Sequence, residues 1–356
     1  MPARPAIVTR PFTEFSTASP SLLIVDDSAV ARAVMTRTIE QSGRFAVAAA
    51  VPHAHAALRF LQDARVDGIL LDIEMPGIDG LSALPDLIVA GGEARVLVVS
   101  SSADEGGANT IQALALGAAD TLVKPGAGAL AGRFARQLQD KLDRLFAPEE
   151  RIASEPGTGA VASPSDFDIV GIGASTGGIH ALGLLLRAIP PSFRLPILVT
   201  QHLPASFMPY FAAQVAVLAG RPCDVATDHM RIRPGRVIVA PGEAHMRCVT
   251  SGDGAAIRLT SEPSRSGCMP SADPMFESMA AVYGARALGV VLSGMGRDGS
   301  EGAKHLAASG AGIYVQDKES SVIWGMPGAV AADGIASAIL PPDEIGRIIA
   351  LRKRPA

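Results

Sequence analysis

Five polar or charged residues in the first half of the chain stand directly after short apolar runs. They are Asp26 and Asp27 after SLLIV, Asp72 after DGILL, Ser100 after ARVLVV, and Lys124 after DTLV. Each apolar run is typical of a buried strand. Because the carboxyl ends of parallel strands meet at one edge of a sheet, we expect these five side chains to converge in one crevice.

Clustered carboxylates repel one another and are costly unless a cation neutralises them. Mg²⁺ suits such a cluster, since it prefers carboxylate and water oxygens. With the metal and Lys124 neutralising charge, Asp72 is placed to attack a phosphoryl group. Alternatively, each acid caps the helix that follows it. For Asp27 alone the cap is favoured, but five such residues at separate strand ends favour a phosphorylation site.

A second motif, GIGASTGG (171–178), follows a strand and opens a helix. The backbone N–H groups of a helix start stabilise negative charge, which suits the oxyanion of acyl transfer. Ser175 is therefore the candidate nucleophile. Dinucleotide binding is the competing interpretation, but it requires an acidic residue roughly 20 positions on. No Asp or Glu lies between Asp168 and Asp224. A turn kept small for packing is the remaining alternative.

Two further residues stand at strand ends in the second half. His202 follows LPILVTQ, and Asp298 lies in SGMGRDG after ALGVVL. Ser175, His202 and Asp298 form an admissible Ser-His-Asp triad, because such triads are defined by geometry and not by chain order. His245 in APGEAHM also follows a strand, and spacing alone does not decide between the two histidines. His180 lies within the helix and is expected to cap or pack.

The apolar pattern predicts alternating strands and helices on both sides of a loop-like segment. The expected fold class is α/β, with two doubly wound parallel-sheet domains. We expect an N-terminal tail over 1–20, a first domain over 21–146, a linker over 147–166 and a second domain over 167–356. Ser28 is the expected N-cap of the first helix, with Val30, Val34, Met35 and Ile39 on one face.

Composition excludes several classes of protein. The formal charge is −4, and only 4 % of residues are aromatic, which argues against nucleic-acid binding. Three cysteines without a C-x-x-C pair argue against a disulfide framework and fit a reducing cytoplasm. No signal peptide and no uninterrupted apolar run of roughly 18 residues is visible, so we expect no direct insertion into a membrane.

The first half resembles the response-regulator receiver domain, with a flavodoxin-like fold. The resemblance rests on VDDS (25–28), LDIEMPGIDG (71–80), SS (100–101) and KP (124–125). It implies phosphorylation of Asp72, Mg²⁺ held by Asp26, Asp27, Asp72 and Glu74, and phosphate contacts from Ser100 and Lys124. Receivers usually carry an aromatic residue three positions before the lysine. Thr121 stands there instead, which puts an aromatic switch of the usual kind in doubt.

The second half resembles the catalytic domain of the CheB family, the chemotaxis protein-glutamate methylesterases, with a Rossmann-like α/β fold. The matching motifs are GASTGG (173–178), QHLP (201–204), APGEAHM (240–246), SGMGRDG (293–299) and WGMPGA (324–329). The resemblance implies Ser175 as nucleophile, with His202 and Asp298 as its partners. It implies that Thr176, Met295 and Gly296 help to form the oxyanion pocket. CMPSADPMF (268–276) matches only loosely, and no role is assigned to it.

The two resemblances together imply a phosphorylation-regulated, cytoplasmic serine esterase of chemotaxis. Its substrates would be methylated chemoreceptors, its phosphodonor a chemotaxis histidine kinase, and its second activity the deamidation of receptor glutamines. Mg²⁺ would be needed at the receiver, and the esterase would need no cofactor. A receiver fused to a nicotinamide-dependent reductase or to a non-catalytic interaction module remains the alternative.

Overall fold

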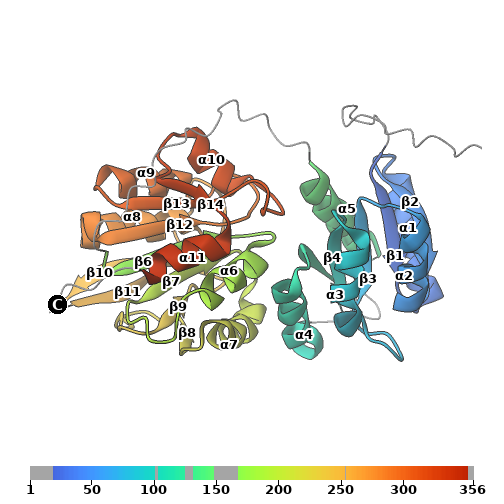
Figure 1. Ribbon diagram of the computed structural model, residues 1–356, viewed down its shortest axis with the longest axis horizontal. Coiled ribbons are helices and arrows are strands. Elements are labelled where there is room, and N and C mark those ends of the chain that lie inside the picture. Colours follow the sequence, from blue (N-terminus) through green and yellow to red (C-terminus); the bar gives the residue numbers. More distant parts are fainter. Residues whose placement is uncertain (1–18, 101–102, 125–130, 148–166, 253, 352–356) are drawn as a thin grey trace, which may run out of the picture.

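The computed structural model describes residues 19–100, 103–124, 131–147, 167–252 and 254–351. The expected tail and linker therefore lie almost wholly outside the described residues. The described chain forms two parallel sheets, each with helices on both faces, and a two-stranded hairpin beside the second sheet (Figure 1). This confirms the predicted α/β class.

The first sheet has the strand order β2-β1-β3-β4-β5, and every neighbouring pair is parallel. Its strands are β1 (Ser21–Val25), β2 (Ala46–Val51), β3 (Gly68–Asp72), β4 (Arg95–Ser100) and β5 (Asp120–Val123). Its helices are α1 (Ala29–Gln41), α2 (Ala54–Asp63), α3 (Gly80–Gly91), α4 (Ala103–Leu116) and α5 (Ala131–Phe146). The direction of winding reverses between β1 and β3, and such a switch point opens a crevice at the carboxyl ends of the strands.

Helix α1 begins as predicted, because the Ser28 hydroxyl accepts a hydrogen bond from the backbone N–H of Ala31. The prediction of its buried face was partly wrong. Met35 and Ile39 are buried, whereas Val30 and Val34 are 74 % and 39 % exposed. A helix turns by about 100° per residue, so Val30 and Val34 share one strip and Met35 and Ile39 the next. Only the second strip faces the sheet.

The second sheet has the order β14-β13-β12-β6-β7-β9-β8. Its strands are β6 (Ile169–Ala174), β7 (Ile197–Gln201), β8 (Cys223–Val225), β9 (Val237–Val239), β12 (Ala287–Val291), β13 (Gly312–Gln316) and β14 (Ala338–Leu340). Its helices are α6 (Gly178–Arg187), η1 (Ala205–Phe207), α7 (Met208–Ala219), α8 (Ala272–Tyr283), η2 (Gly284–Arg286), α9 (Ser300–Ala308), α10 (Met326–Ala332) and α11 (Pro342–Ala350). The winding reverses between β6 and β12, which marks the expected ligand crevice of this sheet.

An antiparallel hairpin, β10 (His245–Ser251) with β11 (Gly254–Thr260), interrupts the strand–helix alternation. The alternating pattern did not predict it. Its inner face is covered by α8, where the backbone N–H of Cys248 donates to the Ser278 hydroxyl. The hairpin and α8 therefore form one unit that delivers the segment 261–271 to the carboxyl edge of the second sheet.

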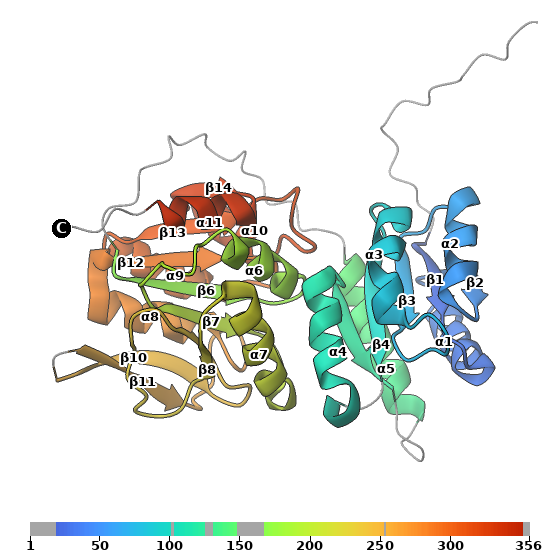
Figure 2. The same cartoon turned by 60° about the horizontal axis from the view of Figure 1, so that its bottom comes forward.

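Helix α4 packs against the first sheet on one side and against helices of the second domain on the other. Both views place it beside α6 and α7 (Figure 2). At Gly107 an added Cβ would lie 2.6 Å from the Tyr210 ring, so the helix backbone rests directly on that side chain. The Ala119 carbonyl accepts a hydrogen bond from the Gly177 backbone N–H at 3.0 Å. The first domain thus contacts the turn that carries Ser175.

Among the described helices, none has the length and apolar character that a membrane span requires.

Candidate functional sites

The strand ends of the first sheet form an acidic pocket. Oxygen atoms of Asp26, Asp27 and Asp72 lie within 4.8 Å of one another. Lys124 Nζ lies 2.7 Å from Asp72 Oδ2 and 3.0 Å from Asp26 Oδ2. Burial raises the pKa of Asp72 above its ordinary value, although Lys124 opposes the shift. One lysine therefore only partly compensates the negative charge of this pocket.

This donor set fits a divalent cation. Asp26 Oδ2 is buried and, among the described residues, has no hydrogen-bond partner beyond the ion pair with Lys124. The Lys124 ammonium is shared with Asp72, so one cation serves two buried carboxylates and a second cation would lower the cost of burying them. The Glu74 side chain is exposed, and its carboxylate is not part of the gathered set; its backbone N–H donates to Asp72 Oδ1. The three aspartates are thus the ligands that the geometry offers.

The sequence did not indicate Thr110, which contacts this pocket. Ser100 is buried at the end of β4, and its hydroxyl accepts a hydrogen bond from the Thr110 hydroxyl at 3.1 Å. Thr110 lies on α4, the helix that contacts the second domain. Ser100 and α4 are therefore physically connected. Thr121 is half-buried and takes its place in β5 opposite Val98.

In the second sheet, Ser175 stands on a tight turn between β6 and α6. Gly177 has φ +75°, a left-handed conformation that favours glycine. The Gln201 side-chain amide donates to the Ser175 carbonyl at 2.9 Å, and the Ser175 N–H donates to the Ser293 carbonyl. These bonds tether the turn to β7 and to the loop after β12. The Ser175 hydroxyl itself makes no hydrogen bond within the described part of the chain.

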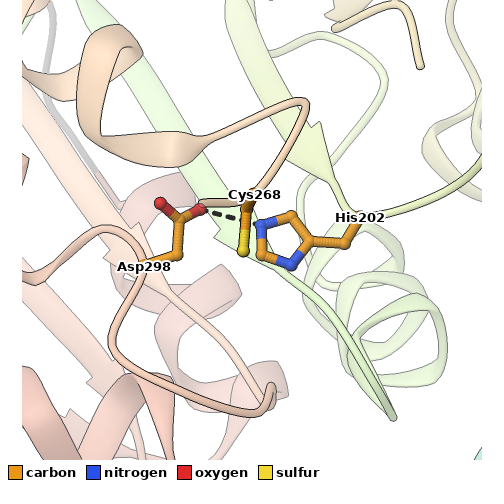
Figure 3. Close-up of side chains that lie close together, drawn as sticks. All are labelled: His202, Cys268 and Asp298. Carbon is orange, nitrogen blue, oxygen red and sulfur yellow. Dashed lines mark hydrogen bonds and ion pairs between the residues drawn. The ribbon is translucent and has the colours of Figure 1, made fainter. Parts of the chain in front are cut away.

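The partly buried His202 and the buried Asp298 form a pair, with 2.8 Å between Nε2 and Oδ2 (Figure 3). The His202 backbone N–H donates to the Ala174 carbonyl, one residue before Ser175. Because Nε2 faces Asp298, Nδ1 is the ring nitrogen left to take a proton. The structure thus brings two of the three predicted triad residues into contact and places the third on the neighbouring strand end.

The Asp298 carboxylate is held at the start of α8. Its Oδ1 accepts from the Ser271 hydroxyl at 2.5 Å, and its Oδ2 accepts from the Ala272 backbone N–H at 2.7 Å. Burial alone would raise the pKa of Asp298, but hydrogen bonds from His202, Ala272 and Ser271 lower it to about 2. Burial disfavours the imidazolium, yet the bonds to Asp298 and Cys268 raise the pKa of His202 to about 9.

Ser271 has a supporting role that the sequence analysis missed. It is the N-cap of α8, accepting from the Asp273 backbone N–H, and it donates to Asp298 as well. A serine two residues before an aspartate at the start of an apolar helix was the available signal for a cap. The same hydroxyl also donates to Asp298, which lies 27 positions away in the chain, and local sequence could not predict that contact.

His245, the rival base, is fully engaged elsewhere. It is 1 % exposed; its Nδ1 accepts from the Ser271 backbone N–H, and its Nε2 donates to the Glu262 carbonyl. A histidine with both ring nitrogens bound to backbone groups has no nitrogen left for a substrate proton. His180 packs against the first domain, with Nδ1 3.0 Å from the Ala115 carbonyl. The geometry therefore favours His202 as the base.

Three backbone N–H groups in the loops that follow β6 and β12 are the candidate oxyanion donors. In the described chain, the backbone N–H groups of Thr176, Met295 and Gly296 donate no hydrogen bond, whereas the Thr176 carbonyl accepts from the Ser293 hydroxyl. Gly296 has φ +81°, and Met295 is 38 % exposed. An oxyanion requires N–H donors that have no other acceptor, and these three groups meet that condition.

Comparisons with known proteins give a matching family model for each half of the chain. The family model described as CheB methylesterase matches residues 170–349, and that of the response regulator receiver domain matches 22–131. The chain belongs to the CheB methylesterase family. The family predicted from the sequence motifs is therefore confirmed.

Among CheB relatives, the protein-glutamate methylesterase/protein-glutamine glutaminase 2 of Caulobacter vibrioides is 42 % identical, over 94 % of this chain and 99 % of that protein. The corresponding protein 1 of Paramagnetospirillum magneticum is 38 % identical, over 93 % and 95 %. The crystal structure of the Thermotoga maritima CheB methylesterase catalytic domain is 31 % identical, with a TM-score of 0.51. It covers 53 % of this chain and 100 % of that chain.

Proposed function

We propose that this chain is a phosphorylation-regulated protein-glutamate methylesterase that hydrolyses glutamate methyl esters on chemoreceptors during chemotaxis adaptation. Amide hydrolysis of receptor glutamines is the second activity, since the same acyl chemistry serves both and the relatives' names state both. The domains would be a receiver over 21–146 and a catalytic domain over 167–356, joined by a linker over 147–166 and preceded by a tail over 1–20.

The proposed reaction uses Ser175 as nucleophile. His202 Nδ1 takes the hydroxyl proton while Oγ attacks the ester carbonyl, and the N–H groups of Thr176, Met295 and Gly296 stabilise the oxyanion. His202 returns the proton to the leaving methanol. Water then attacks the acyl-enzyme in the same way and releases the glutamate side chain. Asp298 holds the imidazole and stabilises the imidazolium.

The observation that carries this proposal is the His202–Asp298 pair at the switch point beside the Ser175 turn. Methanol release from methylated chemoreceptor membranes tests it. Ser175→Ala should lower kcat by on the order of 10⁶-fold, the cost of losing the nucleophile in a Ser-His-Asp enzyme. His245→Gln is the informative comparison, because it retains Ser175 and His202. Near-full activity of Ser175→Ala would refute the mechanism.

Regulation would start at the acidic pocket. Asp26, Asp27 and Asp72 would hold Mg²⁺, which would neutralise charge while a histidine kinase phosphorylates Asp72. Ser100 and Lys124 would contact the phosphoryl group. The bond between Ser100 and Thr110 links that pocket to α4, and α4 lies against α6 and α7. Docking of α4 would restrain the Ser175 turn until phosphorylation shifts the interface.

A small phosphodonor tests this regulation without the kinase. In the presence of Mg²⁺, it should raise methanol release several-fold for the wild type and not for Asp72→Asn. Removal of Mg²⁺ with a chelator should abolish the increase while leaving basal activity, because the esterase residues use no metal. An equal increase in Asp72→Asn would show that the donor acts elsewhere.

A further inference from the structure

Cys268 lies in the segment for which the sequence analysis assigned no role. Its thiol sits beside the His202–Asp298 pair, next to the imidazole edge that carries Nε2 (Figure 3). Ligand atoms of His202, Cys268 and Asp298 all lie within 4.8 Å of one another. The hydrolytic steps proposed above make no use of the thiol. One nitrogen, one sulfur and one oxygen donor thus meet at a point where only two of them serve the esterase.

We propose that His202, Cys268 and Asp298 form a binding site for Zn²⁺, and that Zn²⁺ bound there inhibits the esterase. Zinc takes thiolate, imidazole and carboxylate ligands and completes a tetrahedral site with water. The proposed metal site depends only on the positions of the three ligand atoms and not on the proposed esterase function. The inhibition rests on the proposed function, because it requires His202 to be the base.

The distances between the ligand atoms would allow Zn²⁺ to bind after small movements of the side chains. In a tetrahedral site with Zn–N and Zn–O near 2.0–2.2 Å and Zn–S near 2.3 Å, ligand atoms lie roughly 3.3–3.6 Å apart. His202 Nε2 and Asp298 Oδ2 are 2.8 Å apart and need to separate by only a fraction of an ångström. Zinc would then take the place of the proton that the two residues share.

The surrounding bonds fix two of the ligands. Asp298 keeps its bonds from Ser271 and Ala272, and such outer contacts orient a metal-binding carboxylate. The Cys268 backbone N–H donates to the Ser266 hydroxyl, and its carbonyl accepts from the Ser264 hydroxyl. The thiol is therefore carried by a loop with its own hydrogen bonds, and it is half-exposed, so an ion can reach it.

Zinc at this position would block catalysis in a defined way. The imidazole would be held by the metal through Nε2, and Asp298 would no longer stabilise a protonated His202. Because the imidazolium could not form, His202 could not accept the Ser175 proton. Inhibition should therefore lower kcat and should be reversed by a chelator.

The first experiment measures methanol release by the full-length protein against Zn²⁺, with excess Mg²⁺ present to occupy the aspartate pocket. Cys268→Ser should raise the half-inhibiting Zn²⁺ concentration by at least about 10–100-fold, as loss of contacts at a metal site does. Cys223→Ser is the matched control, since Cys223 is also half-exposed but lies in β8, and it should respond as the wild type does. Equal sensitivity of all three proteins would overturn the site.

A second experiment uses Co²⁺ as a spectroscopic probe and does not depend on hydrolysis. A thiolate-to-cobalt absorption band should appear in the wild type, in Cys223→Ser and in Ser175→Ala, and it should be lost in Cys268→Ser. Cobalt at the receiver aspartates gives no such band, because that pocket has no sulfur. Absence of the band in the wild type would overturn the site. A band in a wild-type protein that releases no methanol even when free of Co²⁺ and Zn²⁺ would instead refute the proposed function and leave the site standing.

Discussion

The charge state of a single side chain, His202, sets the pH range in which the proposed triad can work. Burial opposes the imidazolium, but the contacts with Asp298 and Cys268 raise the pKa of His202 to about 9. A general base must be neutral to accept a proton. At neutral pH this histidine is mostly protonated, so the resting pair is an imidazolium–carboxylate pair.

We therefore expect kcat/KM for ester hydrolysis to rise with pH and to level off only above about pH 9. In Asp298→Asn the negative partner is lost, so the pKa of His202 should fall and the profile should shift to lower pH. The same substitution should lower the plateau of kcat by about 10⁴-fold, because the imidazolium loses its stabilising carboxylate. A wild-type profile that levels off below pH 7 would contradict this account.

At the level of secondary structure, three strand ends and one helix start build the proposed catalytic site. β6 brings Ser175, β7 brings His202, the loop after β12 brings Asp298, and the start of α8 holds Asp298 through Ser271. Close approach of these elements requires glycine at specific points. At Gly294, an added Cβ would lie 2.8 Å from Ser175 Cβ and 2.3 Å from Met326 Sδ.

Gly294→Ala should therefore push the Ser175 turn away from His202. A misplacement of about 1 Å can cost about 10²-fold in rate, and we expect a loss of kcat of that order. Overpacking should also lower the free energy of unfolding by about 1–3 kcal/mol. Gly254→Ala is the control, since its Cβ would meet nothing within 4 Å. Steady-state kinetics with denaturant unfolding would measure both effects, and unchanged kcat in Gly294→Ala would contradict the packing argument.

At the scale of the whole molecule, the two domains meet through α4 of the first and α6, α7 and η1 of the second. The contact reaches the Ser175 turn through the hydrogen bond from the Gly177 N–H to the Ala119 carbonyl. Because the loop after β13 also packs its Val322 and Ile323 on the first domain, both sides of the Ser175 turn are restrained. Separation of the domains would release this restraint.

Gly107→Leu should open this interface, because even a Cβ at Gly107 would lie 2.6 Å from the Tyr210 ring. We expect basal methanol release to rise several-fold and the phosphodonor to add little more. Ala108→Leu is the matched control, since Ala108 lies on the same helix and is exposed. If Gly107→Leu has the basal activity and phosphodonor response of the wild type, docking of α4 does not restrain the esterase.

The two parallel-sheet folds could be predicted from the sequence, since buried strands of β-branched and aliphatic residues alternate with amphipathic helices. It also placed Asp26, Asp27, Asp72, Ser175, His202 and Asp298 at strand ends, because the carboxyl edge of a parallel sheet gathers such residues wherever they stand in the chain. These inferences need only local patterns and one rule of topology.

Residue spacing left His202 and His245 open, and the family resemblance pointed to His202. The structure supplies the physical reason that favours His202, because both ring nitrogens of His245 are already bound to distant backbone groups. It alone brought Ser271 and Cys268 to the His202–Asp298 pair, through a hairpin that the strand–helix alternation did not predict. Contacts of this kind join residues far apart in the chain. They depend on how whole helices and strands pack, which cannot be predicted from the spacing of residues along the chain.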